Sequence, residues 1–198
     1  IDSRKKNWQT SFEMNGYKAR VWSGFSFDPV SGLAFVVTGS SGGITGWWRN
    51  DPNLEVTLIA VNIKSGEIAW TFQHIEHDIW DLDLVGSPLV LDLEVNEKKY
   101  RAVTALSKTG DIILLNAING EPIHKDSFEI VDVPQSDLPG EKTALMQKKF
   151  SKPEPFWGTV VDIENDFSHL DEENLEYVKN KLRHSKSGFF FPPQLIMI

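Results

Sequence analysis

One sequence pattern occurs twice in this chain. The segments LIAVNIKSGEIAW (58–70) and IILLNAINGEPIH (112–124) each contain four apolar residues, then asparagine, then Gly-Glu after three further residues. The offset of 54 residues aligns Asn62 with Asn116. Each copy has the order of a β-hairpin, with an apolar strand, a turn and a second strand. A hairpin that recurs at this spacing predicts propeller blades, because one blade cannot bury both of its faces and needs neighbours.

Glycine and tryptophan give these two hairpins their expected structure. Gly66 and Gly120 occupy matching turn positions, where glycine can adopt the positive φ that a tight hairpin requires. Trp70 ends the first copy and His124 takes its place in the second. We expect Trp70 to pack between neighbouring blades, because a buried aromatic ring of this size fills the space between two sheets.

Short β-like segments dominate the first two thirds of the chain. Turn sequences such as DPVSG, KSGE, NEKK and SKTG separate them. Strands of this length with turns every eight to twelve residues are typical of antiparallel all-β proteins rather than βαβ units. The expected strands are residues 21–27, 33–39, 56–63, 67–73, 87–93, 101–106 and 111–117.

The sequence changes character after residue 124. Residues 125–167 are rich in proline, lysine and polar side chains, which predicts a long loop excursion. Residues 168–186 are expected to form one short helix, because Ser168 and Asp171 have the spacing of a capping box before an apolar helical pattern. The double proline in 187–198 excludes a helix there, so this segment is expected to begin another strand.

Composition excludes several classes of function. The formal net charge of −8 makes nucleic acid an improbable partner. Cysteine is absent, so a metal would need oxygen or imidazole ligands. No apolar run reaches the roughly 20 residues that a membrane helix needs. Because the chain begins at Ile1 and stops at Ile198 inside an apolar run, we expect it to be a fragment of a longer protein.

Acidic residues crowd the stretch HDIWDLDL (77–84). If this stretch were an alternating strand, Asp81 and Asp83 would lie on one face and Trp80 and Leu82 on the other. Two such carboxylates repel each other unless a cation or a proton lies between them, and they suit a hard divalent metal or a general base. The alternative is a turn in which the acids cap backbone N–H groups and face water. The spacing alone leaves both possibilities open.

A wider segment around these acids resembles a known enzyme family. AVNIKSGEIAWTFQHIEHDIWDLDLVGSPLVLDL is similar to the part of pyrroloquinoline quinone (PQQ) dependent dehydrogenases that leads into the active site. In that family, the aspartate after the tryptophan of this motif is the catalytic base and a ligand of the divalent metal. The resemblance assigns both roles to Asp81.

Two further segments extend the resemblance over nearly the whole chain from residue 17. ALSKTGDIILLNAINGEPI resembles the next blade of the glucose dehydrogenase type, in which the lysine of the K-T-G turn binds the quinone oxygens. That lysine is Lys108. VWSGFSFDPVSGLAFVVTGS resembles the family segment whose first tryptophan forms the floor on which PQQ stacks, and here this residue is Trp22. The family implies an eight-bladed propeller, of which this chain would supply about three to four blades, with residues 17–124 carrying the site.

The chain departs from the family pattern at the metal. An asparagine that binds the metal in alcohol-oxidising members is replaced by Ser40, whose hydroxyl is a weaker ligand. Asp83 is similar to the extra carboxylate of lanthanide-using alcohol dehydrogenases, but an acid also occurs at this position in glucose-type members. The resemblance therefore implies Ca²⁺ or Mg²⁺ as the metal, with Asp81, Ser40 and Asp83 as candidate ligands.

The resemblance implies a periplasmic oxidoreductase that uses PQQ to oxidise a sugar or polyol and passes electrons to a membrane quinone. It would lie on the outer face of the inner membrane, attached through segments absent from this chain. The remaining blades of the propeller would be its partners, and the fragment alone would be inactive. The alternative is a non-catalytic propeller scaffold of the outer-membrane assembly type. Such a scaffold has no reason to keep Trp22, Asp81 and Lys108 in register with the family.

Overall fold

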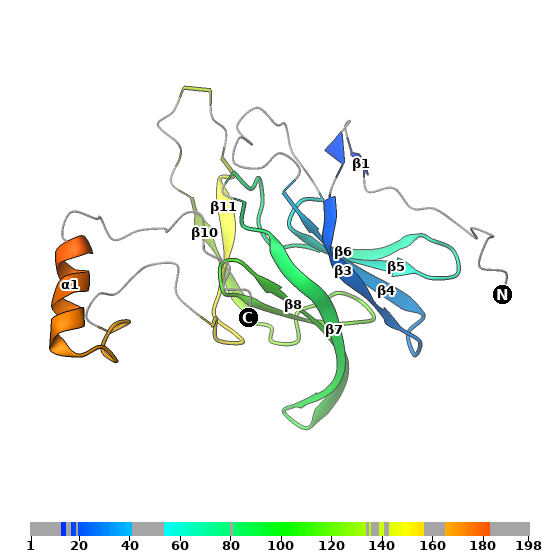
Figure 1. Ribbon diagram of the computed structural model, residues 1–198. Coiled ribbons are helices and arrows are strands. Elements are labelled where there is room, and N and C mark those ends of the chain that lie inside the picture. Colours follow the sequence, from blue (N-terminus) through cyan, green and yellow to red (C-terminus); the bar gives the residue numbers. More distant parts are fainter. Residues whose placement is uncertain are drawn as a thin grey trace.

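The computed structural model describes residues 13–14, 17–18, 20–40, 54–79, 81–133, 135, 139–140, 143–156 and 165–182. The described part is mainly antiparallel β-structure with one short helix, which confirms the all-β prediction. Its strands form two blade-like sheets and two small hairpins (Figure 1). The total number of blades in the whole propeller stays a prediction.

The first blade-like sheet has four strands in sequence order. Each strand pairs antiparallel with the next, as in a meander. Apolar residues alternate along the second strand, so that Leu33, Phe35 and Val37 point into the core. The strands are β3 (Arg20–Asp28), β4 (Leu33–Gly39), β5 (Thr57–Asn62) and β6 (Ile68–Gln73).

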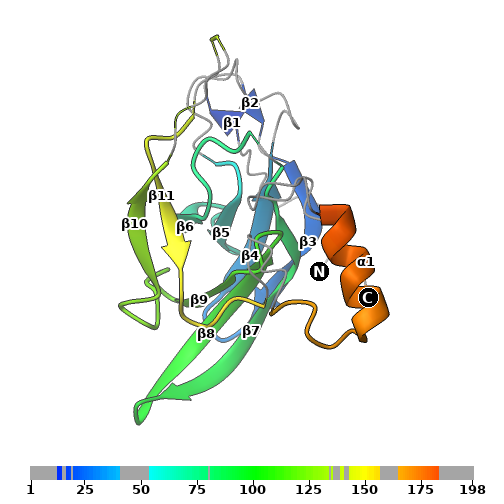
Figure 2. The ribbon, with the colours of Figure 1, turned by 90° about the vertical axis from the view of Figure 1, so that its left-hand side faces the viewer.

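The second blade-like sheet contains β7 (Leu84–Val95), β8 (Lys98–Ser107) and β9 (Ile112–Asn116). All three strands are antiparallel, and an isolated bridge between Leu115 and Pro122 continues the sheet beyond β9. The β7–β8 hairpin projects well beyond its neighbours (Figures 1 and 2). The seven strands of the two sheets match the seven predicted segments, with ends that differ by a few residues.

The repeated sequence pattern folds into the same turn twice. Asn62 donates its backbone N–H to Glu67 O at 2.8 Å, and Asn116 makes the same bond to Glu121 O at 2.8 Å. The side-chain oxygen of each asparagine accepts a backbone N–H two residues later. The turn glycines have φ values of +77° and +73°. The matched asparagines and glycines therefore specify one hairpin geometry, as the sequence predicts.

Trp70 joins the two blade-like sheets, as expected. Its indole N–H donates to Ala117 O at 3.1 Å, and its ring packs against Phe35 with centroids 5.8 Å apart. A Cβ atom on Gly120 would come within 2.7 Å of the indole, so this glycine is needed for close approach as well as for its positive φ. The core around it lies between the sheets and contains Leu58, Leu84, Ile113, Leu115 and other buried aliphatic residues.

The region 125–167 contains regular structure that the prediction of a loop excursion missed. β10 (Phe128–Asp132) and β11 (Met146–Phe150) pair as an antiparallel hairpin. Most of its side chains are exposed or half-buried, so the sequence lacks the apolar alternation of an ordinary strand. Phe128 and Phe150 attach the hairpin to the core through Phe72, with centroid distances of 6.1 and 6.3 Å.

The helix is shorter than predicted. α1 spans Glu172–Leu182 and has no buried residue. Asp171 caps it, because its carboxylate accepts the backbone N–H of Asn174 at 2.9 Å. Ser168 therefore precedes the helix instead of capping it. Residues 183–198, where the predicted helix ends and another strand was expected to begin, lie outside the described residues.

Two very short strands, β1 (Glu13–Met14) and β2 (Tyr17–Lys18), pair ahead of the first blade-like sheet.

No helix in the described part of the chain is long and apolar enough to cross a membrane.

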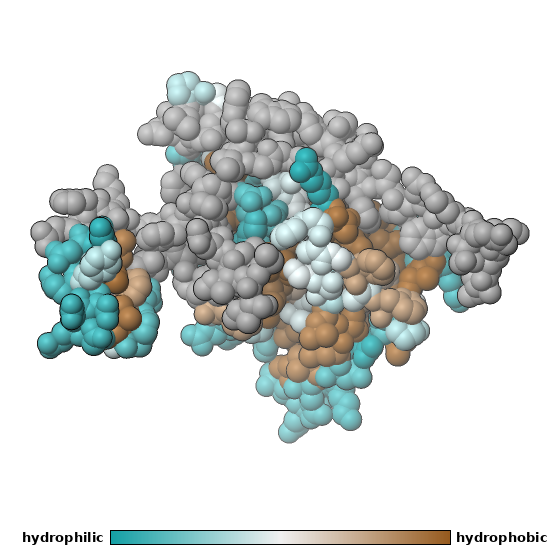
Figure 3. All heavy atoms as spheres, in the orientation of Figure 1, coloured by the Kyte–Doolittle hydropathy of each residue, from teal (hydrophilic) through white to brown (hydrophobic). Residues whose placement is uncertain are grey.

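Apolar side chains lie exposed along the first strands of both blade-like sheets. β3 and β7 contact each other, and Figure 3 shows apolar side chains gathered on the face where these strands lie in Figure 1. Phe25 is 69% exposed and Leu89 is 61% exposed. Exposed side chains of this size are typical of a surface that another part of a protein covers.

An ion pair between Asp28 and Arg101 links the two sheets. Arg101 Nη2 lies 2.7 Å from Asp28 Oδ1, and the carboxylate also accepts the N–H groups of Val30 and Ser31 in the β3–β4 turn. Asp28 is fully buried. The bond from Arg101 holds the pKa of Asp28 well below its usual value of 3.8, although burial opposes this.

We expect Asp28→Asn to remove a pH-dependent part of the stability. A depressed pKa stabilises the folded state above the unfolded value, about 3.9, and this contribution is lost as the pH falls through the folded value. At pH 7 the variant should lose about 1–3 kcal/mol of unfolding free energy. Asparagine can still accept a turn N–H, and the difference in unfolding free energy from the unsubstituted full-length protein should shrink as the pH falls below about 3.9. Urea unfolding of both proteins at pH 7 and pH 3 measures this difference in unfolding free energy. An equal difference at the two pH values would contradict this prediction.

Candidate functional site

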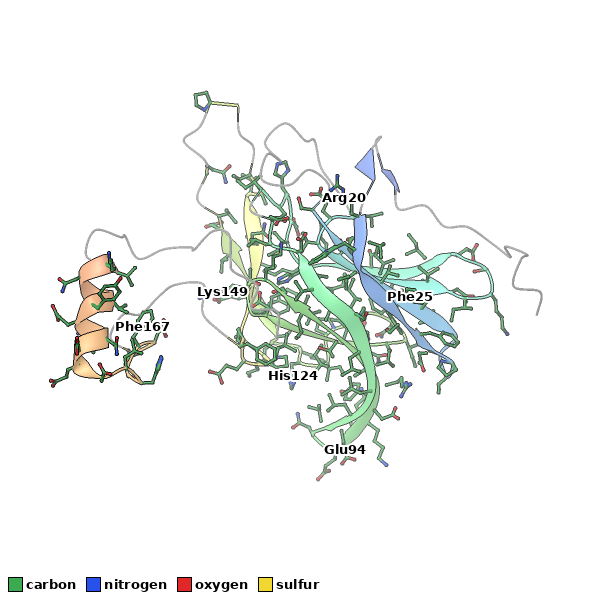
Figure 4. All side chains as sticks on the ribbon, viewed as in Figure 1. Arg20, Phe25, Glu94, His124, Lys149 and Phe167 are labelled. Atoms are coloured by element: carbon green, nitrogen blue, oxygen red, sulfur yellow. The ribbon has the colours of Figure 1, made fainter. Side chains whose placement is uncertain are left out.

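The five predicted site residues converge at one end of the two blade-like sheets. Trp22 lies near the start of β3 and Ser40 directly follows β4. Asp81 and Asp83 precede β7, and Lys108 follows β8. The site is therefore at the end where β3 and β7 begin. Figure 4 shows Arg20 at this end and Glu94 at the opposite tip of the β7–β8 hairpin.

Lys108 is the centre of the cluster. Its ammonium lies 2.8 Å from Asp81 Oδ2 and 2.6 Å from Asp83 Oδ2. The lysine side chain is only 11% exposed. Burial alone would lower the pKa of Lys108, but the hydrogen bonds to the two carboxylates outweigh it and raise the pKa above its usual value of 10.5. The cation that two neighbouring carboxylates require is therefore a lysine of this chain.

Asp83 is fixed on both carboxylate oxygens. Oδ1 accepts the backbone N–H of Ser40 at 2.7 Å, while Oδ2 receives the Lys108 ammonium. The backbone carbonyl of Asp83 accepts the N–H of Lys108 at 3.0 Å. Burial raises the pKa of this carboxyl, against the opposing effects of its hydrogen bonds from Lys108 and Ser40. Asp83 therefore connects β4 to the turn that carries Lys108.

Trp22 presents an open aromatic surface beside the lysine. The residue is 50% exposed, and Lys108 Nζ lies 5.6 Å from the centroid of its ring. Gly39 allows this arrangement, because a Cβ atom there would come within 2.4 Å of Asp83 Oδ1 and 2.8 Å of the indole nitrogen. A flat molecule with an oxygen-rich edge could stack on this indole and meet the ammonium.

Asp81 contacts Lys108 from a loop conformation, and not from the alternating strand that its spacing to Asp83 suggested. Residues 81–83 are not in a strand, because β7 begins at Leu84. Asp81 has a φ of +59°, which is uncommon outside glycine and better tolerated by aspartate and asparagine than by most residues. Its carboxylate is 37% exposed, so it can meet a ligand as well as Lys108. Trp80, expected on the opposite face, lies outside the described residues.

Among the acids of residues 77–84, Asp78 caps a backbone N–H group, as in the alternative of a turn. This buried aspartate accepts the backbone N–H of Leu82 at 2.8 Å and so fixes the loop ahead of β7. Its role is structural. Asp81 and Asp83 instead face an ammonium, and Asp83 is buried rather than directed at water.

The oxygen donors suit a hard metal but form only part of a ligand set. Among the residues that the structure describes, no three His, Cys, Asp or Glu side chains come together to hold a metal. Calcium takes about six to eight oxygen ligands and magnesium about six. Asp81 has a partly exposed carboxylate, and Ser40, whose backbone N–H binds Asp83, also carries a hydroxyl, so these residues could hold one side of a metal whose other ligands come from elsewhere.

Sequence reasoning missed a second polar cluster, formed by His74 and side chains of the turn that carries Lys108. His74 is buried at the end of β6, and its Nε2 lies 3.2 Å from Asp111 Oδ2 and 3.3 Å from Thr109 Oγ1. Ser107 Oγ accepts the backbone N–H groups of Thr109 and Asp111, each at 3.2 Å. The run S-K-T-G-D around Lys108 was a usable signal, because three of its residues have side chains that can bond within their own turn.

Comparison with known proteins gives a family match over almost the whole chain. Residues 2–197 match the family described as "Glucose/ethanol/alcohol dehydrogenase, beta-propeller domain" with the short name PQQ. The chain is 40% identical over 65 residues to the quinoprotein glucose dehydrogenase of Escherichia coli, covering 33% of this chain and 8% of that protein. It is 29% identical over 153 residues to quinoprotein glucose dehydrogenase A of Acinetobacter calcoaceticus, covering 74% of this chain and 18% of that protein.

Solved structures show the same fold. A europium-containing methanol dehydrogenase aligns with a TM-score of 0.51 at 26% identity, covering 54% of this chain and 19% of that one. The quinohemoprotein alcohol dehydrogenase ADHIIG of Pseudomonas putida also aligns with a TM-score of 0.51, at 23% identity, covering 55% of this chain and 16% of that one. Each of these proteins is several times longer than this chain.

Proposed function

This chain belongs to the PQQ glucose/ethanol/alcohol dehydrogenase β-propeller family, and we propose that it forms part of an oxidoreductase that oxidises a hydroxyl of a sugar or polyol. The observation that carries the proposal is the convergence of Trp22, Asp81 and Lys108. The three residues come from separate parts of two sheets, yet Lys108 lies within 2.8 Å of Asp81 and 5.6 Å of the Trp22 ring centroid. This arrangement offers an aromatic floor, a cation and a carboxylate in one place.

Trp22 and Lys108 are the proposed cofactor-binding residues. The exposed indole provides a flat apolar surface for a planar ring system. The Lys108 ammonium, held beside it by two carboxylates, would bind the oxygen-rich edge of that ring. When bound, PQQ supplies an orthoquinone that accepts a hydride from the substrate.

Asp81 is the proposed catalytic base. The partly exposed carboxylate of Asp81 can accept the proton of a substrate hydroxyl, and its ion pair with Lys108 keeps the carboxylate oriented. Lys108 also stabilises the negative charge of Asp81 before the proton arrives. The proton would therefore move from the substrate oxygen to a carboxylate oxygen of Asp81.

The proposed metal is Ca²⁺ or Mg²⁺, with Asp81 as a ligand and Ser40 as a second. Asp83 is the least suitable of the three candidates, because Ser40 N–H and Lys108 already bind both of its oxygens. Each oxygen of Asp83 thus keeps only part of its capacity to accept, and the Lys108 ammonium at Oδ2 would repel a metal cation there. This argues for a calcium-type or magnesium-type site over a lanthanide site.

We propose a membrane quinone as the electron acceptor and the outer face of the inner membrane, in the periplasm, as the location. The names of two relatives, quinate/shikimate dehydrogenase (quinone) and alcohol dehydrogenase (quinone), support a quinone as the acceptor. Further blades of the same protein would cover the exposed apolar residues on β3 and β7, such as Phe25 and Leu89. The scaffold alternative is not favoured, because the family match is to dehydrogenases.

The proposed function predicts reconstitution of activity. We expect the full-length apoprotein with PQQ and Ca²⁺ or Mg²⁺ to reduce an artificial electron-accepting dye when glucose or another sugar or polyol is added. Reactions without PQQ, or with a chelator, are the controls. A protein that reduces no dye with any member of a broad sugar and polyol panel would support the scaffold alternative instead.

A further inference from the structure

His74 contacts the turn that carries Lys108 through Thr109 and Asp111. It lies just after β6, 34 residues before Lys108, and is fully buried. Its ring nitrogen Nε2 is 3.2 Å from Asp111 Oδ2. Its backbone N–H donates to Val56 O at 2.8 Å, which fixes the histidine to the residue directly before β5 of the first sheet. One side chain thus connects the first blade-like sheet to the 107–111 turn of the second.

The chemistry of the groups determines the direction of the hydrogen bonds. A carboxylate only accepts, so the Thr109 hydroxyl donates to Asp111 Oδ2, and Thr109 Oγ1 in turn accepts from His74 Nε2 at 3.3 Å. His74 Nε2 also lies 3.2 Å from Asp111 Oδ2. Ser107 can then donate its hydroxyl to Thr109, while its oxygen accepts two backbone N–H groups of the turn. The contacts of the cluster are all made when the N–H at Nε2 of His74 acts as the donor.

The other nitrogen of His74 has no hydrogen-bond partner among the described residues. Nδ1 is buried and unpaired, and the ring otherwise packs edge-on against Phe150 with centroids 5.0 Å apart. Burying an unpaired polar atom costs free energy. An aliphatic residue would avoid that cost, so the polar contact that His74 does make, with the Lys108 turn, is the one that explains a histidine here.

The turn itself holds Lys108 between two sets of contacts. Lys108 donates its backbone N–H to Asp83 O at 3.0 Å, and its ammonium contacts Asp81 and Asp83. In the same turn, Thr109 and Asp111 contact His74. Gly110 closes the turn with a φ of +86°. Movement of Thr109 and Asp111 would therefore move Lys108.

We propose that His74 is a positioning residue for Lys108, acting through Asp111 and Thr109. It fixes the 107–111 turn to the first sheet, so that the ammonium stays between Asp81, Asp83 and the exposed face of Trp22. The consequence for PQQ binding rests on the proposed function, whereas the effect on the turn does not.

The test compares His74→Leu with His74→Gln in the full-length protein. Leucine fills the buried space without a donor, and glutamine can return an N–H near the position of Nε2. We expect His74→Leu to weaken PQQ binding about tenfold and to speed amide hydrogen exchange of residues 107–111 in the apoprotein. His74→Gln should recover most of both losses. His124→Leu is the matched control for replacing a histidine outside this cluster.

A double-mutant cycle with Lys108→Met separates positioning from a general structural role. If His74 acts through Lys108, His74→Leu should weaken PQQ binding no further once Lys108→Met is present. Additive losses, or a His74→Leu variant with unchanged PQQ affinity and unchanged exchange at 107–111, would overturn the inference. Should His74→Leu fail to fold, Asp111→Asn replaces it in the same cycle. If the unsubstituted protein binds no PQQ, the proposed function fails, while hydrogen exchange still decides the role of His74.

Discussion

Replacing Asp81 with asparagine in the full-length protein is expected to lower dye reduction about 10²–10⁴-fold, the usual contribution of a general base, while PQQ stays bound. Asparagine matches the shape of aspartate but cannot accept a proton from the substrate. It also tolerates the φ of +59° at this position, so the local backbone should not change. Steady-state dye reduction and equilibrium PQQ binding, measured on the same preparation, separate catalysis from cofactor binding.

The control for this change is Asp132→Asn, an exposed aspartate at the end of β10. It makes the same chemical substitution away from the site and should leave both measurements unchanged. Near-normal turnover by Asp81→Asn would remove Asp81 from its proposed role. Loss of PQQ binding together with activity would show that Asp81 holds the cofactor or its metal without identifying it as the base.

Replacing Lys108 with methionine should affect both binding and stability. Methionine keeps the length of the side chain but loses a charge-assisted hydrogen bond, so we expect PQQ affinity to fall about 10²-fold. Asp81 and Asp83 would then face each other without a cation, and Asp83 is buried. The unfolding free energy of the apoprotein should fall by about 1–3 kcal/mol. Thermal unfolding and PQQ titration measure the two effects independently.

The stability part of this prediction has its own control. Adding Asp83→Asn to Lys108→Met removes the buried charge that lost its partner, so the double variant should regain part of the lost stability but none of the PQQ affinity. If Lys108→Met melts at the temperature of the unsubstituted protein, the two carboxylates do not depend on the lysine. If it also binds PQQ normally, Lys108 has no role in the site.

Local patterns were sufficient to predict the two blade-like sheets. The strands from β3 to β9 are runs rich in apolar residues and bounded by turn residues, some alternating and some continuous, and the repeated Asn and Gly positions specify matching hairpins. The β10–β11 hairpin was missed because it has little apolar alternation and is attached to the core by Phe128 and Phe150 near its open end. Its stability comes from tertiary contacts, which a local pattern does not record.

The candidate site could be predicted only in part from the residues themselves. The need for a cation between two carboxylates is elementary electrostatics, but the family resemblance assigned Lys108 to the quinone oxygens, and only the structure places it beside Asp81 and Asp83. Strand alternation grouped Asp81 with Asp83 for the wrong reason, since Asp81 has a positive φ outside any strand. His74 was overlooked because a single histidine after an apolar strand carries no signal until the fold brings the 107–111 turn beside it.

A structure of the full-length protein loaded with PQQ and Ca²⁺ tests the central claim most directly. The claim is that this chain supplies the floor, the cation and the base of the cofactor site. It predicts the ring system of PQQ on the exposed face of Trp22, with Lys108 at its oxygens and Asp81 bound to the metal. PQQ bound elsewhere, or a Trp22 face covered by another part of the protein, would contradict it.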